Sequence, residues 1–161
     1  MAAADDDVES AASLTEAVLT ASRALVAVAA RSLSSAAATA VTLPQYRALV
    51  VLAARGPQRM GDLADALGVH PSTATRLCDR LVDRQLVRRA VDRVNRRETS
   101  VGLSPAGRAL VDAVTDVRRA EIRAIVERIP AESRATAVAA LRAFADAAGE
   151  PPQAAWTLGW T

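Results

Sequence analysis

The sequence predicts a mainly α-helical fold with one small β-hairpin, and three observations support this fold class. Apolar residues recur at helical spacing along most of the 161 residues, as they do in amphipathic helices packed around a core. Hydrophobic residues make up 51% of the chain but aromatic residues only 2%, so the core consists of alanine, leucine and valine, which suits packed helices better than a β-sandwich. Strand-like spacing occurs only in two short runs that flank a charged loop.

A length of 161 residues suits one domain with helical extensions. Helix start and stop signals divide the chain into five consecutive regions. They are a disordered acidic N-terminus (1–8), an apolar helix over 9–31 with a Ser/Ala/Thr-rich connection to 41, a compact unit over 42–103, two apolar helices within 104–148, and an irregular tail over 149–161.

The compact unit begins with a well-marked helix. Thr42 is a good N-cap residue, Pro44 is tolerated in the first turn, and Gln45 lies three residues beyond Thr42, where it closes a capping box. Tyr46 begins the buried face of this helix, which ends at Gly56.

Two more helices and a hairpin follow. We expect helices over about 61–67 and 71–84, separated by a short turn at Gly68. Strands over about 86–91 and 98–103 then flank the charged loop. This order of helix, helix, short turn, helix and hairpin is that of a winged helix-turn-helix, in which the helix after the turn enters the major groove of DNA.

Several kinds of chemistry are disfavoured. The single cysteine, Cys78, excludes an internal disulfide and a cysteine-based zinc site, and the single histidine, His70, forms neither a metal site nor a catalytic triad. The N-terminus is acidic rather than basic, and no run approaches the roughly 18 uninterrupted apolar residues of a membrane span. We therefore expect a cytoplasmic protein that is not an enzyme, with no cofactor, no metal and no membrane partner.

Positive charge is concentrated around the helix that would enter the groove. Between Arg76 and Arg97 the chain has eight arginines against three aspartates, although the net charge of the whole chain is only +2. Arg76, Arg80 and Arg84 recur every four residues and so share one helix face. A polyanion contact would explain this segregation. The alternative is a solvated face on which Asp79 and Asp83 form local ion pairs with the arginines.

Hydroxyl groups cluster at the start of the same helix, at Ser72, Thr73 and Thr75. These hydroxyls can donate to phosphates or contact base edges. The helix N-terminus itself also favours an anion. Helix capping is the alternative role for at least one of them.

Two ordered motifs carry a resemblance to a known family. The segment Leu63-Ala64-(x)2-Leu67-Gly68-Val69-(x)2-Ser72-Thr73-Ala74-Thr75-Arg76-Leu77-(x)2-Arg80-Leu81 resembles the recognition region of the MarR (multiple antibiotic resistance regulator) transcription factors. The segment Asn95-Arg96-Arg97-(x)3-Val101-(x)-Leu103-Ser104-(x)2-Gly107 is similar to their wing signature, Asp-(x)-Arg-(x)3-Val-(x)-Leu-Thr-(x)2-Gly. The resemblance covers roughly residues 10–148, including terminal helices in the order that the family uses for dimerisation.

The resemblance implies homodimers that bind pseudo-palindromic double-stranded DNA, usually as repressors. The matching positions imply groove and phosphate contacts from Ser72, Thr73, Thr75, Arg76 and Arg80. They also imply DNA contacts from the wing-tip residues Arg93 and Arg96, and a brace for the wing formed by Asn95 and Arg97. The family has aspartate at the position of Asn95, so an ion pair with Arg97 is replaced here by a hydrogen bond to a neutral acceptor.

The apolar helices outside the compact unit also point to a dimer, because a second copy is the simplest partner that would bury them. Many relatives release DNA when a small phenolic or aromatic carboxylate ligand binds. Tyr46 and Arg47 form the one aromatic–cation pair near that region, with Tyr46 more simply a core residue. Two alternatives remain: a dimeric module for protein–protein interaction, and a small-ligand-binding protein without specific DNA binding.

Overall fold

The computed structural model describes residues 2–36, 41–91 and 99–150 of the chain. Its elements, in chain order, are α1 (Ala2–Ala36), α2 (Leu43–Arg55), β1 (Gln58–Arg59), α3 (Met60–Leu67), α4 (Pro71–Asp83), β2 (Val87–Val91), β3 (Thr99–Leu103), α5 (Pro105–Val126) and α6 (Ala131–Ala147). The predicted fold class, mainly helical with a hairpin, is confirmed.

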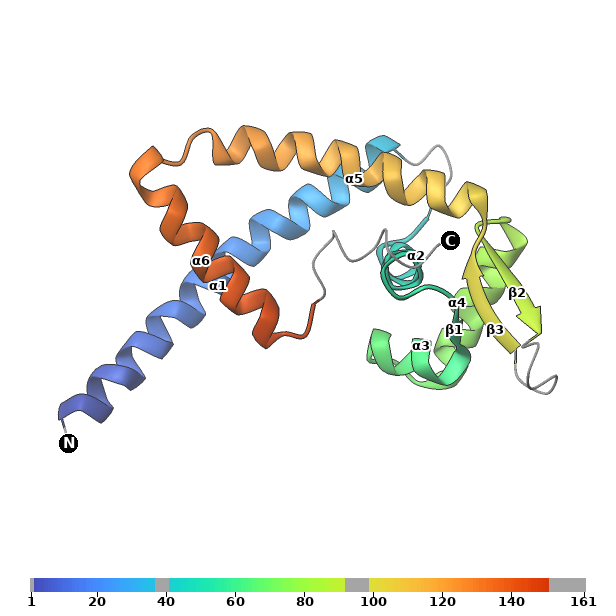
Figure 1. Cartoon of the computed structure of the whole chain (residues 1–161), viewed down its shortest axis with the longest axis horizontal. Helices are drawn as coiled ribbons and strands as arrows, with labels where there is room; N and C mark the ends of the chain where they lie inside the picture. The colour runs from blue at the N-terminus through green and yellow to red at the C-terminus, as the bar shows by residue number, and fades with distance from the viewer. Residues whose placement is uncertain (1, 37–40, 92–98, 151–161) are drawn as a thin grey trace.

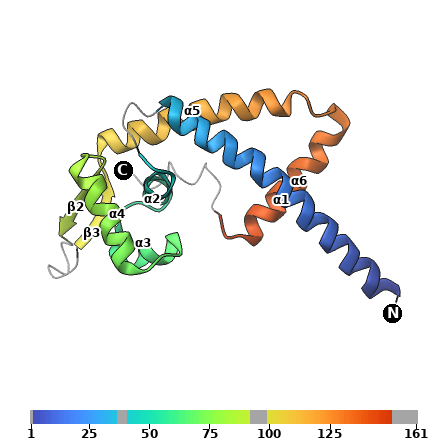
Figure 2. The same cartoon turned by 180° about the vertical axis from the view of Figure 1, so that it is seen from behind.

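The elements form two structural parts (Figure 1). Helices α2 to α4 and the sheet make a compact unit at one end, and the long helices α1 and α5 pack against each other beside it. Helix α6 turns back from the far end of α5 and lies against α1. The first part of α1 projects away from the rest of the chain, as Figure 2 shows from behind.

The hydrophobic core is centred on α2, in which every residue from Ala48 to Ala53 is buried. Leucines of α3 and α4, strand residues such as Val101, and Val111 and Val114 of α5 complete it. The predicted capping box contributes to the start of α2, where the backbone N–H of Thr42 donates to Oε1 of Gln45 at 3.0 Å. Burying so many apolar side chains between α2 and its neighbours supplies most of the driving force for this arrangement.

The sheet is antiparallel with the strand order β1-β3-β2. The predicted hairpin is present, and Val87 pairs with Leu103 at one end of the β2–β3 ladder. The sequence analysis missed β1, in which Gln58 pairs with Val101. Two residues are too few to show an alternating pattern, and β1 exists because β3 offers it a free edge.

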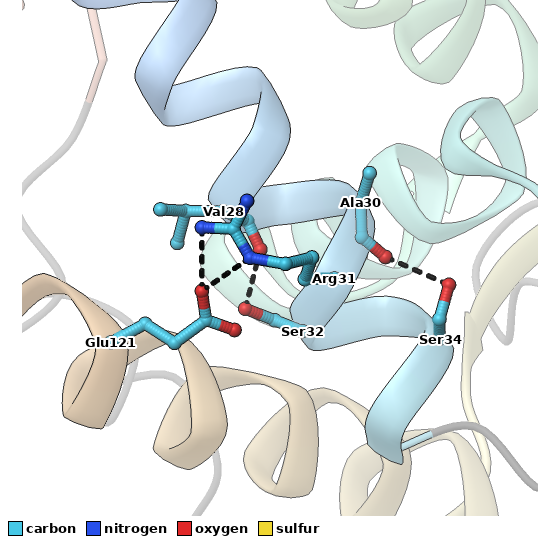
Figure 3. Close-up of polar contacts among 6 residues, drawn as sticks. All are labelled: Val28, Ala30, Arg31, Ser32, Ser34 and Glu121. Carbon is cyan, nitrogen blue, oxygen red and sulfur yellow. Dashed lines mark hydrogen bonds and ion pairs between the residues drawn. The ribbon is translucent and has the colours of Figure 1, made fainter.

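Helix α1 is longer than predicted at both ends, and this corrects two expectations. It begins at Ala2, so residues 2–8 are helical rather than disordered, in keeping with the high helix propensity of the alanines at 2–4. It continues to Ala36 through the first half of the segment, 32–41, that we assigned to a connection. There the hydroxyls of Ser32 and Ser34 donate to the backbone carbonyls of Val28 and Ala30, four residues earlier, at 2.7 and 3.0 Å. These bonds satisfy the serines inside the helix, as Figure 3 shows.

An ion pair joins α1 to α5 in the same region (Figure 3). Arg31 donates from Nε to Oε2 of Glu121 at 3.0 Å, and its NH2 group lies 2.9 Å from the same oxygen. Beside it Val28 and Ser32 are buried. The C-terminal half of α1 is thus attached to α5 by both apolar packing and charge.

Residues Glu9–Ala36 of α1 are long and apolar enough to cross a membrane, with a mean hydropathy of 1.3 over a window that is only 6% buried. Our expectation considered only uninterrupted apolar runs. It did not anticipate this helix, because Arg23 and Arg31 interrupt its run of apolar residues. A single helix of this kind is weak evidence for a membrane, because an apolar helix that packs against a partner has the same composition.

Candidate nucleic-acid interface

Helix α4 presents a buried face and an arginine-bearing face. Ala74, Cys78 and Leu81 are fully buried against the rest of the compact unit. Arg76 and Arg80 are exposed. Within the described part of the chain, neither guanidinium has a side-chain partner. Their spacing of four residues puts them on one face of the helix, so two unneutralised positive charges lie together on the surface.

The start of α4 is capped by His70, which the sequence analysis left without a definite role. Its Nδ1 accepts from the backbone N–H of Ser72 at 3.3 Å and lies 2.9 Å from the Ser72 hydroxyl. Pro71 follows at the first helical position, where its missing N–H costs nothing. His70 therefore caps this helix, and none of the three hydroxyl residues does.

The three hydroxyl residues differ in their surroundings. Ser72 is exposed, whereas Thr73 and Thr75 are half-buried. The hydroxyl of Thr75 donates to the carbonyl of Pro71 at 2.9 Å within its own helix. Ser72 is thus the most exposed of the three, and its hydroxyl lies within hydrogen-bond distance of Nδ1 of His70.

One of the two acidic residues that would offset the arginines of α4, Asp79, has a different partner. Asp79 forms an ion pair with Arg89 of β2, so it links the helix to the wing and does not pair with Arg76 or Arg80. Arg88, next to it on β2, is also exposed. From Arg76 to Val91 the described chain contains five arginines and two aspartates. Arg89 thus faces α4, whereas Arg88, as the next residue of the strand, points to the opposite face of the sheet.

The proposed wing-tip contacts Arg93 and Arg96, and the proposed brace formed by Asn95 and Arg97, lie outside the described residues. Strands β2 and β3 themselves are paired over Val87–Val91 and Thr99–Leu103.

A side-chain hydrogen bond joins the end of α4 to the start of α5. Gln85 has a φ of 59°, a left-handed conformation that reverses the chain after α4. The hydroxyl of Ser104, the N-cap residue of α5, donates to the carbonyl of Gln85 at 2.6 Å and accepts from the backbone N–H of Gly107 at 3.0 Å. The junction between α4 and β2 is therefore joined directly to the first turn of α5.

A pocket of about 370 Å³ lies between α1, α2 and α5. Tyr46 is almost completely buried there, as expected, but the cation over its ring is Arg118 of α5, 5.4 Å from the ring centroid, and not the adjacent Arg47. Burial raises the pKa of Tyr46, while the Thr115 hydroxyl and the Arg118 charge partly oppose that shift. No sequence signal pairs positions 46 and 118, because only the packing of α5 on α2 brings them together. The lining residues are Ala29, Leu43, Pro44, Tyr46, Arg47, Val50 and Arg118.

Cys78 is buried and unsuited to redox chemistry. Burial raises the pKa of its thiol to about 11, so the reactive thiolate is suppressed. Within the described ranges, no three histidine, cysteine or acidic residues come together as a metal site would require.

Apolar side chains also lie exposed on α1 and α6. Leu14 and Leu25 on α1 face Leu141 and Phe144 on α6 across an apolar groove of about 440 Å³, and all four are more than half exposed. Helix α6 contains no buried residue. Such a surface is unusual on a chain that remains alone in water.

Comparison with known proteins places these features in context. Residues 41–99 match the MarR family model. A crystal structure of RV1404 from Mycobacterium tuberculosis is 44% identical in sequence and covers 87% of this chain and 95% of its own, with a TM-score of 0.82. The structure of a MarR family protein from Bacillus stearothermophilus has a TM-score of 0.78 at 22% identity, covering 88% of this chain and 96% of its own.

Two further relatives are informative. The uncharacterized HTH-type transcriptional regulator YsmB of Bacillus subtilis is 32% identical over 88 residues, which are 55% of this chain and 60% of YsmB. The matched region thus spans about three fifths of that curated relative. A single-residue mutant of MepR from Staphylococcus aureus, solved bound to an oligodeoxyribonucleotide, has a TM-score of 0.61 at 22% identity and covers 83% of this chain and 96% of its own.

Proposed function

This chain belongs to the MarR family of winged-helix proteins, and we propose that it is a homodimeric transcriptional repressor that binds a pseudo-palindromic site in double-stranded DNA. The observation that carries the proposal is the pair of exposed arginines, Arg76 and Arg80, on the face of α4 opposite its buried residues, with no side-chain partner among the described residues. Such a face can donate to phosphates and to guanine edges at once.

The proposed contacts divide by chemistry. Arg76 and Arg80 are assigned to base edges, and Ser72 is assigned to a phosphate because it lies at the helix N-terminus, where an anion is favoured. Thr73 and Thr75 are half-buried and are assigned to close contacts near the backbone. Arg93 and Arg96 of the wing are assigned to the adjacent minor groove on the strength of the motif alone.

The homodimer accounts for the exposed apolar surface. A second copy that covers the α1–α6 groove would bury Leu14, Leu25, Leu141 and Phe144, which the single chain leaves in water. A two-fold axis through this surface would present two α4 helices to the same side of the DNA, about 34 Å apart for successive major grooves. A regulator of this kind works where the DNA is, so we assign it to the cytoplasm and give it no catalytic activity.

The test is a selection of bound duplexes from random DNA, followed by titration of the best duplex at several salt concentrations. A two-fold symmetric site and a steep salt dependence are expected. Arg76→Ala should cost about 1–3 kcal/mol of binding and relax the preference at one base pair if this side chain contacts a base. Arg123→Ala on α5 is the matched control, because it removes another exposed arginine and should leave binding unchanged.

If no sequence is enriched and Arg76→Ala behaves like Arg123→Ala, DNA recognition by α4 is ruled out. The chain would then be a dimeric protein-interaction module.

A small effector ligand is a second component of the proposal, favoured by the Tyr46 pocket. An apolar pocket with one aromatic ring and one guanidinium suits a small aromatic or phenolic compound, with a carboxylate facing Arg118. Salicylate is a simple probe of this class. We expect it to raise the melting temperature of the protein and to weaken its DNA binding, and expect Arg118→Ala to abolish both effects.

A further inference from the structure

One residue, Ser104, binds two successive carbonyls of the chain reversal that follows α4. Its hydroxyl donates to the carbonyl of Gln85 at 2.6 Å, and its backbone N–H donates to the carbonyl of Leu86 at 3.1 Å. Hydrogen bonds are directional, so two bonds to successive carbonyls fix an angle where a single bond would leave a pivot. The end of α4 is therefore fixed in angle as well as in position relative to the start of α5.

The contacts around this joint leave it little freedom. Gln85 is in the left-handed conformation, with a φ of 59°, and the backbone N–H of Leu86 donates to the carbonyl of Leu81 in α4 at 2.9 Å. On the α5 side, Gly107 approaches the Leu86 carbonyl so closely that a Cβ would have no room. The last turn of α4 and the first turn of α5 thus meet as two rigid pieces.

Apolar packing does not by itself specify this angle. Val111 and Val114 of α5 pack into the core centred on α2, but hydrophobic burial is non-directional. Helix α4 has 13 residues and is about 20 Å long, so a tilt of about 10° at its last turn would move its first turn by about 3.5 Å, close to the rise of one base pair. Arg76 and Arg80 would move with the helix.

We propose that Ser104 is a positioning residue for DNA binding, which sets the angle of α4 against α5 and thereby the separation of the two α4 helices in the dimer. The role rests on the proposed function, because it requires a homodimer on a two-fold symmetric site. Ser104 is half-buried and acts through Gln85 and Leu86 rather than by touching DNA. A rigid joint permits one spacing between half-sites, whereas a loosened joint tolerates neighbouring spacings.

Helix capping alone is the competing role for Ser104. Its hydroxyl also accepts from the backbone N–H of Gly107 at 3.0 Å, as the side chain of an N-cap residue does. Capping requires an acceptor, whereas the bond to Gln85 requires a donor. Ionised aspartate is a good N-cap residue that has no proton to donate, so Ser104→Asp keeps the cap and breaks the side-chain bond to Gln85.

The test compares Ser104→Asp with three other variants of the full chain. Ser104→Thr keeps both the donor and the acceptor, and Ser104→Ala removes both. Ala106→Asp adds the same charge at an exposed position of the same helical turn and leaves Ser104 intact, so it controls for the effect of the charge on DNA. Affinity is measured for the duplex that the wild type selects, and for the same duplex with one base pair inserted or removed between its half-sites.

The ratio of these affinities is the readout, because a uniform loss of binding or of stability cancels from it. We expect Ser104→Asp and Ser104→Ala to reduce the discrimination between spacings several-fold. Ser104→Thr and Ala106→Asp should retain the discrimination of the wild type. Unchanged discrimination in Ser104→Asp, including a loss in Ser104→Ala alone, would leave only the capping role and overturn the proposal, as would equal losses in Ser104→Asp and Ala106→Asp.

Hydrogen exchange without DNA separates the positioning role from the proposed function. Ser104→Asp should speed the amide exchange of Leu86 several-fold, while the amides of Gly107 and Arg108 in the first turn of α5 keep their wild-type protection. A wild type that enriches no duplex contradicts the proposed function, and the positioning role falls with it. A wild type that prefers one spacing, with equal exchange at Leu86 in Ser104→Asp, contradicts the positioning role alone.

Discussion

Gly107 in the first turn of α5 lies so close to Leu86 that a Cβ at position 107 would be 2.0 Å from the Leu86 carbonyl oxygen. The opposing atom is backbone at the start of the wing, so it cannot move without shifting β2. Position 107 requires a glycine because there is no room for a Cβ. The backbone conformation does not impose this requirement, since the φ of Gly107 is not in the left-handed region. This contact joins the first turn of α5 to the compact unit that contains α4 and the sheet.

Gly107→Ala is therefore expected to destabilise the protein by about 3 kcal/mol, at the upper end of the range for overpacking. Thermal and urea unfolding would measure the change. Gly61→Ala in α3 is the control, because a Cβ there meets nothing within 4 Å, and it should stabilise the helix by up to about 1 kcal/mol. Equal effects of the two substitutions would contradict the close contact.

Cys78 should resist thiol reagents in the folded protein. With its pKa raised by burial to about 11, only about one thiol in a thousand is ionised near pH 8. Labelling should be slow in the native state and become fast in denaturant. Rapid native labelling at that pH would show that the thiol is accessible after all.

The same shift makes stability depend on pH. Between the ordinary pKa of a thiol and about 11, the unfolded chain has released a proton that the folded chain retains. The free energy of unfolding should therefore fall as the pH rises through this window. Cys78→Ala should remove this part of the pH dependence, which comparison of the two unfolding curves would reveal.

Asp79→Asn tests the link between α4 and the wing. The Asp79–Arg89 pair is nearly half exposed on both sides, so its loss should change stability by no more than about 1 kcal/mol. Removing a negative charge beside Arg76 and Arg80 should nevertheless strengthen DNA binding, measured by titration at fixed salt. Asp116→Asn on α5 breaks a comparable exposed pair with Arg119 and should leave DNA binding unchanged. Weaker binding by Asp79→Asn alone would mean that the pair positions the wing instead.

Leu141→Glu tests the dimer. A carboxylate in the α1–α6 groove would have to be buried without a partner if a second copy covers the groove, and this is strongly unfavourable. Analytical ultracentrifugation should show a monomer and DNA titration a loss of cooperative binding. Ala139→Glu adds the same charge to an exposed position of α6 outside the groove and should stay dimeric. If both variants remain dimers, the interface lies elsewhere.

Local signals were enough to predict most of the elements. The capping box at Thr42, the glycine after α3 and the prolines at the starts of α4 and α5 act within a few residues, so the predicted helix starts are close to the observed ones. The hairpin followed from the change in spacing. The two ends of α1 were predicted wrongly, because serine-rich composition suggests a connection until one sees the Ser32 and Ser34 hydroxyls bonded within the helix.

The sequence by itself determined the helical fold class, the hairpin and the placing of Arg76 and Arg80 on one face of α4, because these depend on periodicity and on residues only a few positions apart. Tertiary structure alone decided that Asp79 pairs with Arg89, that Arg118 lies over Tyr46, that Arg47 holds Glu150 and that Gly107 meets Leu86. Each of these pairs joins different elements, up to 103 positions apart, and no local pattern specifies such a contact. Packing around α2 brings them together. These contacts distinguish the arginines that bind other elements from Arg76 and Arg80, which have no side-chain partner among the described residues.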